Sequence, residues 1–135
     1  LKTAEKNAVP LQVEGLRVIL VSRVAPYNFL NLLWRTNCES DVKQYNIHRG
    51  TQPGFVPDDS NRIGVVDADT IEKGSPDYGH TPIDRKLREF DHQMYRDEKV
   101  QPGTTYYYRV CAVDAAGQAG PYSLEAKGRT KPAGP

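Results

Sequence analysis

The sequence has little that would specify a membrane anchor or a reactive centre. Two cysteines, one tryptophan and one methionine occur among 135 residues. The longest apolar run, residues 29–34, is interrupted by Asn31 and is far too short to span a bilayer. The chain opens without a methionine on the polar segment LKTAEKNAVP, which does not resemble a signal peptide. We therefore expect no membrane insertion, and we expect the chain to be a piece of a longer protein.

Neither sign of charge predominates. Eighteen Lys and Arg residues against seventeen Asp and Glu residues leave a formal net charge of +1. No basic stripe emerges from the sequence, which argues against nucleic acid as a partner. The length and the hydrophobic fraction of 38% suit a single globular domain with one core, and we expect a monomer.

The two cysteines do not form a recognisable framework. Cys38 and Cys111 lack C-x-x-C spacing and a nearby cluster of histidines, so a zinc site is not expected. A disulfide between them is one alternative. Two free thiols is the favoured one, because a domain of this length does not need a covalent staple.

Motifs for catalysis and cofactor binding are missing. No serine lies in a G-x-S-x-G context, and neither a phosphate loop nor a dinucleotide fingerprint occurs. Asp67 and Asp69 could offer oxygens to calcium, but their spacing does not follow an EF-hand loop. The three histidines are far apart in the sequence. We predict no catalytic residue, no cofactor and no metal ion.

Strand signals dominate what is present. Seven segments are rich in β-branched and aromatic residues, and Gly and Pro separate most of them. These segments are residues 15–21, 28–34, 45–49, 62–66, 94–99, 105–114 and 123–130. Their number and spacing predict an all-β, seven-stranded, immunoglobulin-like sandwich.

One segment does not fit this regular spacing of short strands and turns. Residues 67–93 are too long for an ordinary sandwich loop. Apolar residues within and after it follow helical offsets of four, three and four, at Ile83, Leu87, Phe90 and Met94. We predict an inserted short helix near residues 82–91.

The tyrosine triplet predicts which side chains enter the core. Tyr106 follows a Pro-Gly turn by three residues, as in the tyrosine corner of immunoglobulin-like sandwiches. Because side chains alternate along a strand, Tyr108 and Val110 then also point inward. Tyr107 and Arg109 point outward. The predicted core comprises Trp34, Tyr45, Tyr106, Tyr108 and Val110.

Several of these segments together resemble a fibronectin type III domain. The resemblance is carried by residues 31–34 (NLLW), 39–49, 100–110 (VQPGTTYYYRV) and 112–117. It is strongest to the variety found beside catalytic domains in secreted bacterial polysaccharide-degrading enzymes. The match covers residues 10–130, in which the insertion at 67–93 is not standard. Residues 1–9, which precede Pro10, and the Pro-containing residues 131–135 are interpreted as linkers.

The resemblance implies a function without catalysis. It indicates an accessory or spacer module of a larger secreted, cell-surface or periplasmic bacterial protein, with adjacent domains as its partners. The alternative is a weak carbohydrate-binding module. Its contacts to a polysaccharide would come from the outward residues His48, Tyr107 and Arg109 of one sheet.

The other sheet is expected to carry an apolar outer face. The family topology pairs the first two strands, so that Ile19, Val21, Phe29 and Leu33 lie together on the outer side. A patch of this kind is rarely left bare on a monomer. Either the inserted helix or a neighbouring domain would cover it. The helix is favoured because it has a matching apolar stripe.

Overall fold

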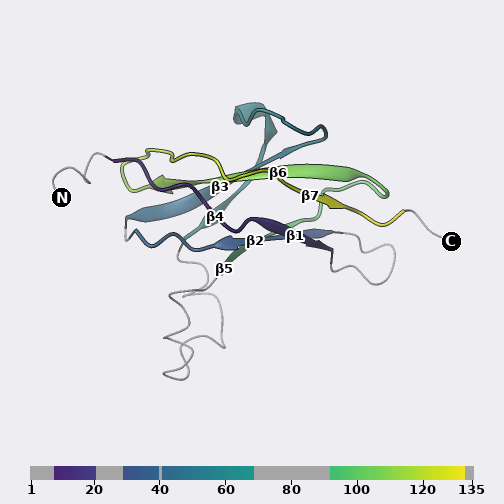
Figure 1. Cartoon of the computed structure of the whole chain (residues 1–135), viewed down its shortest axis with the longest axis horizontal. Coiled ribbons are helices and arrows are strands. Elements are labelled where there is room, and N and C mark those ends of the chain that lie inside the picture. Colours follow the sequence, from purple (N-terminus) through teal and green to yellow (C-terminus); the bar gives the residue numbers. More distant parts are fainter. Residues whose placement is uncertain (1–7, 21–28, 40, 69–91, 133–135) are drawn as a thin grey trace, which may run out of the picture.

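Two antiparallel sheets pack face to face in the computed structural model, which describes residues 8–20, 29–39, 41–68 and 92–132. The three-stranded sheet has the order β1 (Arg17–Leu20), β2 (Leu30–Arg35) and β5 (His92–Asp97). The four-stranded sheet has the order β4 (Arg62–Asp67), β3 (Val42–Gly50), β6 (Thr105–Asp114) and β7 (Ala126–Arg129). Figure 1 shows β3, β6 and β7 in one layer above β1, β2 and β5. The predicted all-β sandwich is confirmed.

Helical structure is nearly absent from the described ranges. A single 3-10 turn, η1 (Asp59–Asn61), lies between β3 and β4, and the Asp58 side chain caps it. Hydrogen bonds from Ser60 lower the pKa of this carboxyl. The helix predicted near residues 82–91, with most of the insertion, lies outside the described residues. No helix in the described part of the chain could cross a membrane.

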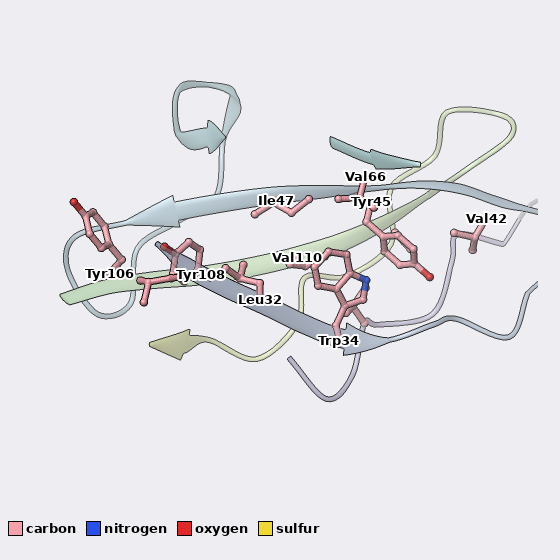
Figure 2. Packing of buried hydrophobic residues seen from close by; sticks show 12 residues of the cluster. Leu32, Trp34, Val42, Tyr45, Ile47, Val66, Tyr106, Tyr108 and Val110 are labelled. Atoms are coloured by element: carbon pink, nitrogen blue, oxygen red, sulfur yellow. The ribbon is translucent and has the colours of Figure 1, made fainter. Parts of the chain in front are cut away.

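The core forms where the inward-facing rows of the two sheets meet. The rings of Trp34 and Tyr45 lie edge to face, with centroids 5.4 Å apart. Figure 2 shows Trp34 and Leu32 of one sheet facing Tyr45, Ile47 and Val110 of the other. The five residues predicted for the core are each at most 5% exposed. Alternation of apolar and polar residues on β2, β3 and β6 produces this arrangement.

The Tyr106 hydroxyl closes the turn that precedes β6. It accepts a hydrogen bond of 2.7 Å from the backbone N–H of Gln101. Gly103 adopts a φ of 60° within this turn, a conformation that glycine takes without steric cost. The side chain thus bonds to backbone near the Pro-Gly turn, as expected for a tyrosine corner.

A buried carboxylate joins the two sheets beside this corner. Asp97 of β5, whose side chain is 3% exposed, accepts hydrogen bonds from Arg49 of β3 at 3.0 and 2.9 Å. The Tyr108 hydroxyl of β6 donates a third bond at 2.6 Å, and the Lys99 N–H donates a fourth at 3.2 Å. The Arg49 guanidinium also lies over the Tyr106 ring, 4.9 Å from its centroid.

Protonation states in this network follow from its burial and its hydrogen bonds. Burial, and then the bond to Asp97, raise the pKa of Tyr108 far above its ordinary value, so this hydroxyl stays a donor. Burial alone would lower the pKa of Arg49, but the hydrogen bonds and charge of Asp97 raise it. Both side-chain donors to Asp97, Arg49 and Tyr108, therefore keep the protonation states that satisfy its oxygens.

The last strand begins later than the sequence indicates. β7 starts at Ala126, whereas strand signals begin at Ser123. Ser123 bonds instead to a single residue of β6: its N–H donates to the Val110 carbonyl at 2.8 Å, and its hydroxyl accepts from the Val110 N–H at 3.0 Å. Because the side chain takes one of these two bonds, the regular ladder does not extend to this residue.

We predict that Tyr106→Phe destabilises the domain by about 1–2 kcal/mol, because the Gln101 N–H loses its acceptor in a part-buried place. Urea unfolding measures this loss. Tyr107→Phe, on the opposite face of the same strand, serves as the matched control and should change stability by less than about 0.5 kcal/mol. Equal effects of the two variants would contradict the role given to the Tyr106 hydroxyl.

Candidate functional site

The residues predicted to have a functional role lie on the two outer faces of the sandwich. Tyr107 and Arg109 alternate with the buried side chains of β6 and are half-buried on the outer face of the four-stranded sheet. His48 lies opposite Arg109 in the ladder between β3 and β6. The structure therefore brings these three residues onto one face, as the sequence predicts.

The expectation that His48 is exposed on this face is wrong. The residue is 2% exposed because the segment between β3 and β4 and the loop before β7 cover it. Its ring lies edge to face on the Tyr122 ring, with centroids 5.2 Å apart. Figure 1 shows the segment between β3 and β4 on the outer side of the four-stranded layer. His48 cannot touch a ligand at this surface.

Hydrogen bonds define the tautomer of His48. The Asn61 side-chain oxygen accepts from the Asp58 N–H at 2.9 Å, while the Asn61 amide nitrogen donates to the Val56 carbonyl at 2.9 Å. The same oxygen lies 2.8 Å from His48 Nδ1, so Nδ1 carries the proton. Nε2 is buried and has no partner among the described residues. The histidine thus attaches the η1 loop to β3.

Tyr122 covers a second polar side chain of this face. Cys111 faces outward on β6, yet it is fully buried, and the Tyr122 side chain lies close enough to the thiol to influence its pKa. Burial raises the pKa of the Cys111 thiol and also that of Tyr122. Both cysteines are free, and Cys38 is exposed on the turn after β2. A low reactivity of Cys111 follows from its burial.

Arg109 is held at the edge of this covered region. Its Nε lies 4.0 Å from the Glu125 carboxylate, is itself buried, and has no hydrogen-bond partner among the described residues. The Glu125 carboxylate accepts a bond of 2.8 Å from the Gly54 N–H. The loop after β3 is thereby attached to the segment that precedes β7.

The apolar outer face of the three-stranded sheet is present in part. Ile19 is 41% exposed, Leu33 and Phe29 are half-buried, and Val21 lies outside the described residues. The ladder adds Met94 of β5, which pairs with Leu33 and is 50% exposed. We call Ile19, Phe29, Leu33 and Met94 the packing face.

A cationic side chain, that of Arg96, lies within the packing face. It was not predicted there from the sequence. Arg96 of β5 lies over the Phe29 ring, 4.2 Å from its centroid, and its Nε donates to the Asn31 side chain at 3.4 Å. The sequence could have predicted this position. Arg96 follows Met94 by two residues, and residues two apart on a strand point to the same face.

A groove of about 390 Å³ lies beside the turn that carries Cys38. Its main carboxylate is already engaged: Glu39 accepts from the Leu11 N–H at 2.6 Å and from the Asn37 side chain at 3.1 Å. The Asn37 N–H donates to the Tyr45 hydroxyl at 2.8 Å. The bond from Leu11 attaches the segment before β1 to the turn after β2. No group of three metal-ligating side chains gathers within the described ranges, in this groove or elsewhere.

Solved structures identify the architecture. An Fn3-like protein from Clostridium thermocellum is 25% identical to this chain, with a TM-score of 0.55 over 89% of this chain and 92% of that one. The sixth fibronectin type III domain of human fibronectin type III domain containing protein 3 is 20% identical, with a TM-score of 0.58 over 96% and 92%. The chain has the fibronectin type III fold.

The same fibronectin type III fold occurs within a larger enzyme. The Family 28 exopolygalacturonase of Yersinia enterocolitica is 18% identical to this chain, with a TM-score of 0.57. The alignment covers 93% of this chain but 21% of the enzyme. No family model and no curated protein matches the sequence.

We predict that a water-soluble thiol reagent modifies Cys38 rapidly in the native fibronectin type III domain and reaches Cys111 only after unfolding, because burial shields that thiol and raises its pKa. A stopped-flow thiol assay with and without urea checks this. Cys38→Ser should abolish the rapid reaction, and Tyr122→Ala should uncover Cys111. Two equally fast thiols in the native protein would contradict the described cover.

Proposed function

We propose that this domain is a non-catalytic accessory module of a larger secreted bacterial protein that processes polysaccharides. It orients a neighbouring domain of the same polypeptide by packing against it. The contact is made by the packing face of the three-stranded sheet.

The observation that carries this proposal is the exposure of the packing face. Ile19 and Met94 are 41% and 50% exposed, and Leu33 lies between their strands. The solvent side of an antiparallel sheet is ordinarily polar, because only its inner face needs to be buried. Exposed aliphatic side chains on adjacent strands favour contact with another protein surface.

The surroundings of the packing face suit a contact between domains. Such interfaces are more polar than a core and include charged side chains at their margins. Arg96 stacks on Phe29, its side chain is 51% exposed, and its guanidinium lies 3.9 Å from the Glu98 carboxylate. A neighbouring domain would therefore meet aliphatic groups beside a cation that is already held in position.

The setting in a polysaccharide-processing protein is supported by the comparisons. The exopolygalacturonase carries this fold as 21% of its chain, the remainder of that chain lying outside the alignment. A non-catalytic role agrees with the described residues, in which buried polar groups such as Asp97 and His48 serve the fold.

We predict that a thiol placed at Met94 is shielded by the neighbouring domain. In a Cys38→Ser background, Met94→Cys should react with a thiol reagent at least about tenfold more slowly in the longer polypeptide than in the isolated domain, since docking removes it from solvent. The rate of modification measures this protection.

Val65→Cys supplies the matched control. Val65 of β4 is 50% exposed, as Met94 is, but it lies on the four-stranded sheet. Its thiol should react at the same rate in both contexts. Equal rates for Met94→Cys in the two contexts would refute docking through the packing face.

A further inference from the structure

The outer face of β6 and β7 presents an aromatic ring among cations. Tyr106 and Tyr108 point into the core, so Tyr107 and Arg109 point out. On β7, Lys127 lies opposite Tyr107, and Arg129 lies opposite Thr105. Cross-strand partners share a face, and both basic residues are exposed. We call Tyr107, Arg109, Lys127 and Arg129 the Tyr107 face.

The order of these side chains along the strands is regular. Arg129 lies beside one end of the row, Tyr107 and Lys127 share its middle, and Arg109 lies at the other end. Residues two apart in a strand are separated by about 7 Å. An extended ligand that follows β6 would therefore meet a cation, an aromatic ring with a second cation, and a third cation.

The cations of this face are only partly neutralised. Glu125, the residue just before β7, lies 4.0 Å from Arg109 and is the one carboxylate of the described residues that pairs with the Tyr107 face. The Arg109 side chain keeps 32% of its surface exposed, and its buried Nε makes no hydrogen bond within the described part of the chain. Arg129 is oriented by a bond of 3.2 Å to the Thr105 hydroxyl.

A second aromatic ring lies next to Tyr107. Gly50 of β3 is the ladder partner of Tyr107. A side chain at Gly50 would meet the Phe55 ring at 2.5 Å, so this ring lies directly over the glycine. Phe55 and Tyr107, both half-buried, therefore border the same part of the outer surface. The short loop after β3 brings them together, which the sequence did not reveal.

We propose that the Tyr107 face binds an acidic polysaccharide, one whose sugar units carry carboxylates. The Tyr107 ring stacks on the C–H face of a sugar, and Arg109, Lys127 and Arg129 pair with carboxylates on either side. Charge complementarity favours a polyanion over a neutral glycan. The ring favours a sugar over a simple polyanion, because exposed aromatic faces stack on apolar surfaces. This site is on the opposite sheet from the packing face and does not depend on it.

Affinity electrophoresis of the domain tests this proposal, with gels that contain sodium polygalacturonate, alginate or neutral hydroxyethyl cellulose. The carboxylated polymers should retard the domain, and the neutral polymer should not. Lys127→Ala should weaken binding about two- to fivefold, the range for one exposed ion pair. Tyr107→Ala should weaken it further by removing the stacking ring.

Arg17→Ala is the matched control, because Arg17 is an exposed strand residue on the other sheet and its loss removes the same charge. It should leave retardation unchanged. Fluorescence of Trp34 and urea unfolding verify that each variant is folded.

Three outcomes would overturn the proposal. The first is an absence of retardation by either carboxylated polymer. The second is an equal loss of binding in Arg17→Ala and Lys127→Ala, which would indicate attraction by net charge alone. The third is unchanged binding in folded Tyr107→Ala together with equal retardation by dextran sulfate, which would indicate a simple polyanion site.

Discussion

The sandwich depends on how the Asp97 carboxylate is satisfied between its sheets. An ionised carboxylate in a dry interior is strongly unfavourable unless it is paired and hydrogen-bonded. Asp97 belongs to the three-stranded sheet, while its donors Arg49 and Tyr108 belong to two central strands of the four-stranded sheet. All these bonds form together only in one alignment of the two layers. The alignment that satisfies the carboxylate also brings Trp34 against Tyr45 at the other end of the core (Figure 2).

This alignment determines what each outer face can do. Since inward residues alternate with outward ones, the strand that places Tyr108 in the core displays Tyr107 and Arg109 on its outer face. The three-stranded sheet likewise buries Leu32 and displays Leu33. The packing face is mainly apolar, with one cation stacked on Phe29, whereas the Tyr107 face combines an aromatic ring with three cations. A module with two different faces can pack against a neighbour with one and contact a ligand with the other.

Strand patterning made the sandwich, its core and the tyrosine corner predictable, because these depend on period-two alternation and on one turn. The inward position of Arg49 was also predictable, because it follows the inward residues Tyr45 and Ile47 at intervals of two. A buried arginine side chain requires an acidic partner. That this acid is Asp97 depends on the packing of two sheets and is not local. His48 and Cys111 are buried because two loops, which carry Asn61 and Tyr122, fold over the outer face of the sheet. The strand periodicity of the sequence does not predict how these loops fold.

The most direct test is a double-mutant cycle on Arg49→Met and Asp97→Asn, measured by urea unfolding. Removal of Arg49 alone should cost about 2 kcal/mol or more, because it leaves a buried charge without its main partner. The double variant should be more stable than the sum of the single losses predicts, with a coupling of at least about 1 kcal/mol. Losses that add to within about 0.5 kcal/mol would contradict the account, since the carboxylate would then not join the two sheets.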